Sequence, residues 1–425
     1  MIVLNSYGGK KSIVIVGNGC AGAECIKALR ESGYHGEIHL FTDNQWPISS
    51  PMLTTYYVAG KIGFEELFPY GAGQKFYLKY EVNVYAKSPV VVLDAERKVV
   101  AAQSGLELKY DQCLIATGAT PLLPPVEGIG SDRVYTMRTV EDAIRLKEAM
   151  TKKPQKTIVV GASMVGIKVA ELFYKAGVEV CLADLAQHIF PLTAHPECAQ
   201  VIEERLDRKG IRLRFGAGIE KVEETTRGVK AYFEGSTESE EADLLVMCIG
   251  VQANTDFIDR KQVAVDRGIS VDGYMRTSVP GLYAAGDVAQ GENLLSGGSE
   301  IIGLWSNARY QGRTAGRNMT GGNDFFPGNI PHNITRFMGI DFISIGDVND
   351  HDRVEKKYDG KRYIQLFWKS GLLTGANFVD SFTESGPIKT ALIKGLRRKG
   401  AVLSGSLPVI QNQLIKNILL EVERA

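Results

Sequence analysis

Two glycine-rich turns contain the residues of this sequence that are best suited to chemistry. The first turn spans residues 17–22 and reads Gly17-Asn18-Gly19-Cys20-Ala21-Gly22, the Gly-x-Gly-x-x-Gly spacing of a dinucleotide-binding loop. Its first glycine permits a tight turn, the second lets the backbone approach a pyrophosphate, and the third lets helix and strand pack closely. Asp43 follows 21 residues after Gly22, where a carboxylate can accept a hydrogen bond from a ribose hydroxyl. These residues predict that the turn binds a dinucleotide.

The second turn begins 144 residues after the first and reads Gly161-Ala162-Ser163-Met164-Val165-Gly166. Asp184 follows 18 residues after Gly166, and residues 185–188 contain no Arg that could bind a 2′-phosphate. This pattern favours NAD(H) over NADP(H). Because Gly-Ala-Ser replaces Gly-x-Gly, the second turn is the weaker match.

The elements around the two turns recur in the same order. Each turn follows a short β-branched strand and opens a helix, and a second strand leads to the acidic residue. Such a repeat indicates a duplicated nucleotide-binding unit rather than a chance motif. Three more strands run into small-residue turns, and these turns contain Ala116-Thr117-Gly118, Gly250 and Gly286-Asp287-Val288. The predicted class is α/β, with two Rossmann-like domains and a C-terminal α+β domain.

The predicted domains are interleaved along the chain. Residues 1–120 and 247–325 form the first nucleotide-binding domain, residues 121–246 the second, and residues 326–425 the α+β domain. The first domain ends with a helix predicted over Ile302–Asn318. The C-terminal domain is predicted to end with two helices, Ile388–Arg398 and Val409–Glu423.

Composition excludes several other classes of protein. The 425 residues include 49 Lys plus Arg and 49 Asp plus Glu, so net charge does not indicate a nucleic-acid partner. No apolar run is long enough to span a membrane, and we expect a cytoplasmic protein. Six cysteines do not suggest a disulfide framework. Cys20 and Cys25 lie five residues apart on one helix, a rotation of about 500°, so they should not form a redox disulfide.

Together these motifs resemble the FAD-dependent pyridine nucleotide–disulfide oxidoreductases. Residues 47–53 and 59–61 resemble a segment of the ferredoxin-reductase-like members, and the C-terminal part is similar to those of NADH:rubredoxin reductases and to the flavin portion of NADH-dependent nitrite reductases. The resemblance implies FAD on the first turn, with Asp43 on the adenosine ribose and Asp287 on the ribitol chain. It implies NADH on the second turn, with Asp184 on its ribose. The alternative for Asp287 is an N-cap of a helix starting at Val288. The cofactor-binding residues implied are Gly17, Asn18, Gly19, Cys20, Ala21, Gly22, Asp43, Ser50, Val90, Ala116, Thr117, Gly118, Gly286, Asp287, Val288 and Trp305, and also Gly161, Ala162, Ser163, Met164, Val165, Gly166, Asp184 and Gly250.

Three departures from this family pattern matter for function, and one is that Ser50 and Thr55 stand where relatives carry an Arg and a Lys near the flavin. No cysteine occurs between Cys25 and Cys113, where relatives carry their redox thiols, and Ser49 and Ser50 stand there instead. Lys168 replaces an acid that helps to place the nicotinamide in relatives. The Lys168 ammonium either extends into solvent, which we favour, or lies near the flavin.

The sequence therefore predicts an NADH oxidoreductase that needs no thiol and no catalytic side chain, because the flavin supplies the chemistry. The expected partner is a small iron–sulfur or rubredoxin-type electron carrier. The six histidines form no ligand-spaced cluster, so no metal site is expected. Two alternatives stay open: a thiol-free NADH oxidase, or a flavin-containing docking subunit of a larger redox complex whose NADH site is weakened. The chain is expected to be a monomer or a homodimer.

Overall fold

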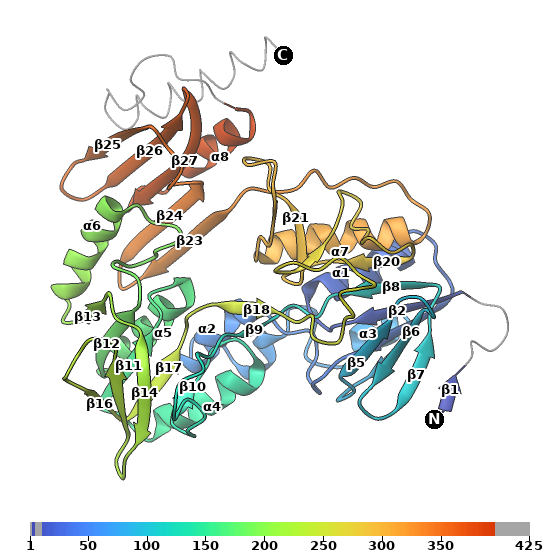
Figure 1. The fold of residues 1–425 in the computed structure, drawn as a ribbon, viewed down its shortest axis with the longest axis horizontal. Helices are drawn as coiled ribbons and strands as arrows, with labels where there is room; N and C mark the ends of the chain where they lie inside the picture. Colours follow the sequence, from blue (N-terminus) through green and yellow to red (C-terminus); the bar gives the residue numbers. More distant parts are fainter. Residues whose placement is uncertain (1, 5–10, 396–425) are drawn as a thin grey trace. The chain divides into compact units, whose positions relative to one another are not determined.

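The computed structural model describes residues 2–4 and 11–395, which form two compact units (Figure 1). Unit 1 takes residues up to 120, residues 138–141 and residues 251–329. Unit 2 takes residues 121–137, residues 142–250 and the chain from 330 onward. The predicted helix Val409–Glu423 lies outside the described residues.

Unit 1 is built on a five-stranded parallel sheet with the strand order β20-β8-β2-β3-β4. All five residues of the central strand β2 are buried, as expected for a strand covered on both faces of a doubly wound sheet. The predicted α/β class is confirmed. The strands are β2 (Ser12–Val16), β3 (Glu37–Phe41), β4 (Val82–Tyr85), β8 (Gln112–Ile115) and β20 (Leu282–Ala284).

Two helices of unit 1, α1 (Cys20–Glu31) and α7 (Trp305–Met319), pack directly against each other (Figure 1). The contact is close because α7 presents glycines four residues apart. A Cβ atom on Gly312 would lie 2.2 Å from the Ala21 carbonyl oxygen, and one on Gly316 would lie 2.7 Å from the Cys25 carbonyl oxygen. The helix predicted over Ile302–Asn318 is present, but it begins at Trp305.

Smaller elements complete unit 1. The helical segments are η1 (Pro51–Leu53), α2 (Thr54–Val58), η2 (Phe64–Leu67) and α3 (Lys75–Lys79). A second sheet has the order β1-β7-β6-β5, from β1 (Ile2–Leu4), β5 (Val90–Asp94), β6 (Val99–Ala102) and β7 (Leu106–Lys109). The remaining strands are β19 (Ile269–Ser270), β21 (Ala289–Glu292) and β22 (Ser299–Glu300), with β18 (Val251–Ala253) paired to β9 (Ala119–Pro121).

The first part of unit 2 repeats the parallel architecture, with the strand order β10-β17-β11-β12-β13. Its strands are β10 (Val134–Tyr135), β11 (Lys156–Val160), β12 (Glu179–Asp184), β13 (Arg212–Phe215) and β17 (Leu244–Met247). Its helices are α4 (Val140–Thr151), α5 (Met164–Lys175) and α6 (Pro196–Asp207). An antiparallel sheet adds β14 (Ile219–Glu224), β15 (Val229–Phe233) and β16 (Glu240–Ala242).

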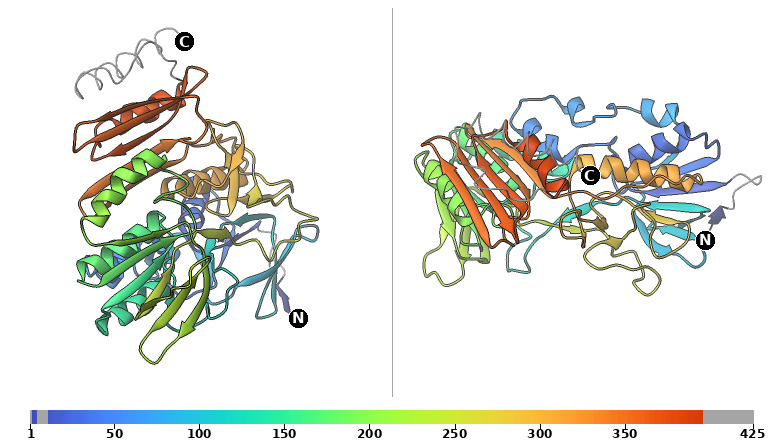
Figure 2. Two further views of the ribbon diagram at one scale, coloured as in Figure 1. Left: turned by 60° about the vertical axis from the view of Figure 1, so that its left-hand side comes forward. Right: turned by 90° about the horizontal axis from the view of Figure 1, so that it is seen from above.

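The C-terminal part of unit 2 is an antiparallel sheet with one helix. Its order is β23-β24-β27-β26-β25, from β23 (His332–Phe337), β24 (Ile340–Gly346), β25 (Arg353–Tyr358), β26 (Tyr363–Lys369) and β27 (Leu372–Val379), followed by α8 (Ser385–Ile393). Helix α6 (green) lies beside this sheet (Figure 2), and Arg205 of α6 forms a 2.6 Å ion pair with Asp380. The helix predicted over Ile388–Arg398 starts earlier, at Ser385. No helix in the described part of the chain is both long enough and apolar enough to cross a membrane.

Candidate dinucleotide-binding sites

The first glycine turn joins β2 to α1 in a conformation that only glycine can adopt. Gly17 has a φ of +116°, and a Cβ atom there would lie 2.1 Å from the Ala116 carbonyl oxygen. A Cβ atom on Gly22 would lie 2.4 Å from the Gly17 carbonyl oxygen. The structure therefore requires both glycines for the tight turn and for the close packing of α1.

Gly19 is the residue of this turn that faces open space. It is the N-cap of α1 and has no side-chain capping hydrogen bond, and a Cβ atom there would meet no atom within 4 Å. The first N–H groups of a helix need acceptors, and they favour an anion. An uncapped helix start beside open space fits the pyrophosphate of a dinucleotide.

The turn that follows β8 lies next to this loop. The backbone carbonyl group of Ala116 packs directly against Gly17 of this loop. Thr117 and Gly118 are bonded to one residue of the returning chain: the Asn254 amide donates to the Thr117 carbonyl oxygen at 2.9 Å, and the Asn254 N–H donates to the Gly118 carbonyl oxygen at 3.0 Å. The predicted segment Ala116-Thr117-Gly118 is thus brought to the first loop.

Asp287 lies in the same unit and is paired with a residue that sequence reasoning missed. The Arg138 guanidinium donates to the Asp287 carboxylate at 2.8 Å, and it lies 3.8 Å from where a Cβ of Gly118 would be. Arg138 stands in a segment with no recognisable motif, so only the tertiary fold reveals it. The Gly286 N–H donates to the Gln311 side chain of α7 at 2.8 Å, which fixes the Gly-Asp turn. After Asp287 the chain forms strand β21, so the helix N-cap alternative for Asp287 is wrong.

The other residues predicted for the first site lie in different surroundings. Asp43 is exposed, and its carboxylate accepts a 2.9 Å hydrogen bond from the Asn44 amide. Ser50 is 2% exposed, and Val90 lies in the smaller sheet opposite Ala102. Asn18 is held by two bonds: its amide donates to the Trp46 carbonyl oxygen and its oxygen accepts from the Tyr77 hydroxyl, both at 3.0 Å. Val288 is fully buried.

Cys20 and Cys25 point into different environments, as the helix geometry predicts. The Cys20 sulfur lies 3.6 Å from the Tyr70 hydroxyl and 3.8 Å from the Trp305 carbonyl oxygen, which places the predicted residue Trp305 at the start of α1. The Cys25 sulfur lies 3.8 Å from the Met319 sulfur. Burial raises the pKa of the Cys20 thiol to about 11. A protonated thiol is a poor nucleophile, so Cys20 is not a reactive cysteine.

A buried carboxylate connects α1 with α7. Glu24 is 1% exposed and accepts from the Tyr70 hydroxyl at 2.8 Å and from Arg313 at 2.8 Å. Burial by itself would raise the pKa of Glu24, but the Tyr70 hydrogen bond and the nearby cations Lys27 and Arg313 lower it. Glu24 therefore stays ionised and holds basic side chains on this face of the unit.

The second glycine turn has the same backbone form. Gly161 has a φ of +108°, a Cβ atom there would lie 2.3 Å from the Cys248 carbonyl oxygen, and one on Gly166 would lie 1.8 Å from the Gly161 carbonyl oxygen. Strand register shows where the acid lies: the Gly161 N–H donates to the Ala183 carbonyl oxygen at 2.7 Å, and Asp184 follows at once. Gly250 is exposed, with a φ of +124°. Met164 and Val165 form the first turn of α5.

Asp184 and Asp43 do not hold equivalent places in the two sheets. In the first sheet the Gly17 N–H donates to the Phe41 carbonyl oxygen at 2.9 Å, so the match to Asp184 is Thr42 and Asp43 lies one residue further. Asp184 also bonds its own loop: its carboxylate accepts from the Ala162 N–H at 2.6 Å and from the Ala186 N–H at 2.8 Å. A carboxylate keeps further acceptor sites after two such bonds, so Asp184 can still bind a ribose hydroxyl.

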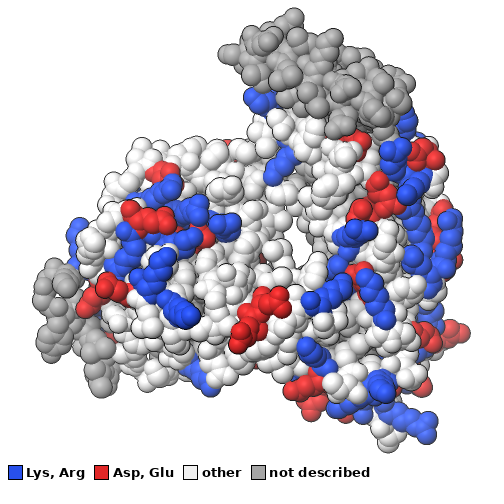
Figure 3. Space-filling model, turned by 180° about the vertical axis from the view of Figure 1, so that it is seen from behind, with Lys and Arg blue, Asp and Glu red and all other residues white. Residues whose placement is uncertain are grey.

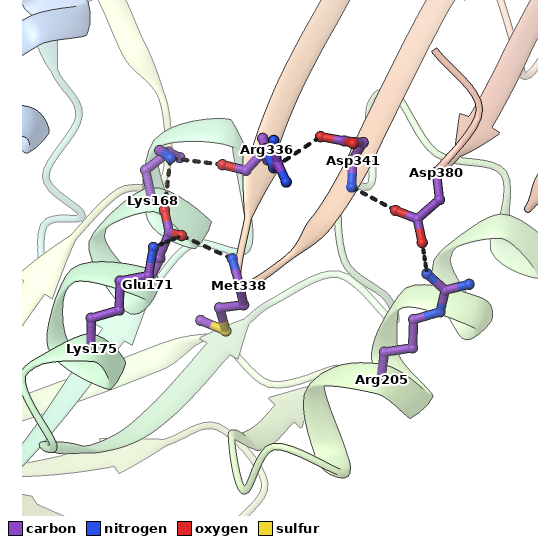
Figure 4. A network of polar contacts seen from close by, with 8 residues as sticks. All are labelled: Lys168, Glu171, Lys175, Arg205, Arg336, Met338, Asp341 and Asp380. Carbon is purple, nitrogen blue, oxygen red and sulfur yellow. Dashed lines mark hydrogen bonds and ion pairs between the residues drawn. The ribbon is translucent and has the colours of Figure 1, made fainter. Parts of the chain in front are cut away.

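Lys168 does not extend freely into solvent, so the favoured expectation is wrong. Its ammonium donates to the Glu171 carboxylate at 2.7 Å and to the Arg336 carbonyl oxygen at 2.8 Å (Figure 4). Glu171 is 6% exposed and also accepts from Lys175 at 2.6 Å and from the Met338 N–H at 2.9 Å. Burial would raise the pKa of Glu171, but these hydrogen bonds lower it to about 2. Lys168 and Glu171 thus bind helix α5 to the β23–β24 hairpin.

The described residues contain no group of three or more His, Cys, Asp or Glu side chains that could hold a metal ion.

Comparison with known proteins agrees with this geometry. The model of the family described as pyridine nucleotide-disulphide oxidoreductase matches residues 11–312. The epsilon subunit of the NADH-dependent phenylglyoxylate dehydrogenase of Aromatoleum evansii is 30% identical over 388 residues, which cover 90% of this chain and 91% of the relative. The rubredoxin-NAD(+) reductase of Pseudomonas putida is 27% identical over 344 residues, 81% of this chain and 88% of the relative.

A solved structure is similar over nearly the whole chain. The reductase in the covalent putidaredoxin reductase–putidaredoxin complex has a TM-score of 0.87 and 25% identity, and the match covers 96% of this chain and 99% of that one. This likeness extends beyond residue 312, where the family model ends.

Proposed function

Because the chain belongs to the pyridine nucleotide-disulphide oxidoreductase family and is an FAD-dependent NADH oxidoreductase, we propose that it exchanges electrons between NADH and a small one-electron carrier protein. In the forward direction one NADH reduces two carriers and yields NAD⁺ and a proton. We propose FAD on the first glycine loop and NAD(H) on the second. The flavin, when bound, supplies the conversion of a two-electron hydride into two single electrons.

The absence of a thiol route is the observation that supports this proposal most. No cysteine lies between Cys25 and Cys113, and the Cys20 thiol is buried with a raised pKa. A disulfide or sulfenate relay needs an accessible thiolate. Electrons that reach the flavin would therefore leave it directly.

In this proposal, different residues of unit 1 bind different parts of FAD. The uncapped N–H groups at Gly19 would bind the pyrophosphate. Asp287 would accept hydrogen bonds from the ribitol hydroxyls, and Arg138 would hold the Asp287 carboxylate in place and add positive charge beside it. The Gly-Asp turn, tied to α7 by Gln311, would keep this carboxylate fixed.

The surface of unit 1 is compatible with an acidic protein partner. Figure 3 shows Lys and Arg side chains gathered on part of this unit. Arg309 and Arg313 of α7 are 47% and 35% exposed, and both pair with the buried Glu24. Cationic surfaces speed up encounters with acidic proteins at low salt. The named relatives include reductases of rubredoxin and putidaredoxin, which supports a carrier of this kind.

Anaerobic spectroscopy tests the proposal. We expect NADH to bleach the flavin absorbance, a rubredoxin or a ferredoxin to restore it rapidly, and air to restore it slowly. Gly166→Ala is a variant in which the new Cβ would lie 1.8 Å from the Gly161 carbonyl oxygen, so it should keep FAD and lose bleaching by NADH. Gly22→Ala makes the matching change in the first loop and should lose FAD itself. Fast reoxidation by air with no reduction of either carrier would instead indicate an NADH oxidase.

A second candidate function is favoured by one comparison. The relative from Aromatoleum evansii is by its name a subunit of a dehydrogenase, and it matches this chain along 91% of its length. We propose as the alternative that this chain is the NADH-reactive subunit of a larger redox enzyme. Purification under native conditions with stoichiometric partner subunits, together with failure to reduce free carriers, would favour this alternative.

A further inference from the structure

The duplicated loops offer an internal comparison, because they share a backbone form but differ at one residue. The N-cap of α1 is Gly19, which makes no side-chain capping bond. The N-cap of α5 is Ser163, whose hydroxyl accepts a hydrogen bond from the Gly166 N–H at 3.2 Å. The second helix start is therefore capped by the protein itself, and the first is not.

The Ser163 hydroxyl also has its only hydrogen committed. It donates to the Cys248 carbonyl oxygen at the end of β17, at 2.9 Å. A serine hydroxyl has one donor and two acceptor sites, so after this bond it has no hydrogen left for a phosphate. A water molecule in the same place could accept from the Gly166 N–H, donate to the Cys248 carbonyl oxygen and still donate to a phosphate oxygen.

We infer that Ser163 is a positioning residue that weakens the hold of the second loop on the pyrophosphate of NAD(H). This inference rests on the proposed placement of NAD(H) on that loop. When the coenzyme is absent, the Ser163 hydroxyl provides the hydrogen-bond acceptor that the Gly166 N–H needs. The same hydroxyl occupies the place from which a bridging water could bind the phosphate.

The difference between the loops suits the different fates of the two nucleotides. FAD stays bound through many turnovers, whereas NAD(H) must leave after each one. A helix start that needs an outside anion retains its ligand, and a helix start that is already capped can release it at lower cost. Ser163 would thus promote exchange of the coenzyme.

The test exchanges the two N-caps. In Ser163→Gly the second loop acquires the form of the first, and we expect the Kd for NADH to fall by roughly three- to tenfold, the equivalent of one net hydrogen bond. The rate of NADH release should slow accordingly, with FAD content unchanged. Ser163→Thr keeps the hydroxyl and serves as the matched control, with a Kd close to that of the wild type.

The reciprocal variant is Gly19→Ser. Gly19 has a backbone φ of −96°, which any residue can adopt, and a Cβ atom added there would meet no atom within 4 Å. The variant should therefore fold, and we expect it to lose FAD faster on dialysis than the wild type while it binds NAD⁺ normally.

Calorimetric titration with NAD⁺ and stopped-flow release of NADH separate this inference from the proposed function. If NADH does not bleach the wild-type flavin, the proposed function fails, but the Kd values of the Ser163 variants can still be compared. If NADH bleaches the flavin and Ser163→Gly binds it no more tightly than the wild type does, the inference about Ser163 is wrong. Full retention of FAD in Gly19→Ser would contradict it as well.

Discussion

The buried carboxylate of Glu171 is expected to be a large single contributor to the stability of unit 2. Its pKa lies at about 2 instead of the usual 4.5, and its side chain is only 7% exposed. One pKa unit corresponds to about 1.4 kcal/mol, so the ionised form stabilises the fold by roughly 3 kcal/mol near neutral pH. Glu171→Gln removes this charge with little change in shape.

The Met338 amide proton provides a local assay of this prediction, because the Met338 N–H donates to Glu171. We expect hydrogen exchange of the β23–β24 hairpin to accelerate by about two orders of magnitude in Glu171→Gln at pH 7, the equivalent of roughly 3 kcal/mol. Glu223→Gln is the matched control. Its carboxylate also binds a lysine, Lys221, at 2.9 Å, but its side chain is 42% exposed, so its loss should have little effect.

The pH dependence has a definite sign. The folded pKa of Glu171 is depressed, so its contribution is complete above the unfolded pKa and is lost as pH falls toward the folded value. The difference between wild type and Glu171→Gln should narrow below about pH 4.5 and become small near pH 2. Equal exchange rates at pH 7, or a difference that stays constant between pH 6 and pH 3, would refute the reasoning.

Three further predictions concern the nucleotide sites. Arg138→Ala should leave a half-buried carboxylate without its cation, and we expect the Kd for FAD to rise by roughly tenfold in fluorescence titration of the deflavinated protein; unchanged affinity would remove this residue from the site. Changing Cys20 and Cys25 together to Ala should leave the rate of flavin reduction by NADH largely intact, and loss of all activity with FAD still bound would show that a thiol takes part. Asp184→Ala combined with Leu185→Arg should shift the ratio of kcat/KM toward NADPH, and an unchanged ratio would contradict the assignment of this carboxylate to the ribose.

The parts of the fold that could be predicted from the sequence depend on local signals. A β-branched run followed by glycine specifies a buried strand and a tight turn, and both glycine loops form as their spacing predicts. Gly17 and Gly161 adopt backbone conformations that glycine tolerates and other residues avoid. The positions of the glycines in one sequence are therefore enough to predict these conformations.

The parts that could not be predicted depend on residues distant in the chain. Arg138 meets Asp287 across 149 residues, and Met338 meets Glu171 across 167, and no periodicity reports such pairs. The sequence alone places Lys168 in solvent because long charged side chains usually reach it, whereas the fold brings a carbonyl oxygen of β23 to its ammonium. Strand β25 is polar and lies at the sheet edge with no buried residue, so no run or alternation of apolar residues indicates it.

The interleaving of the two units has a consequence for synthesis of the protein. Strand β8 ends at Ile115, but its neighbour β20 begins only at Leu282. At typical rates of translation, the residues between them take on the order of ten to thirty seconds to be made. During this interval the nascent chain presents the apolar edge of β8 without its partner strand. An open parallel edge of this kind can pair with other chains, so rapid expression should favour aggregation of the nascent protein, and slower translation or chaperones should favour its recovery.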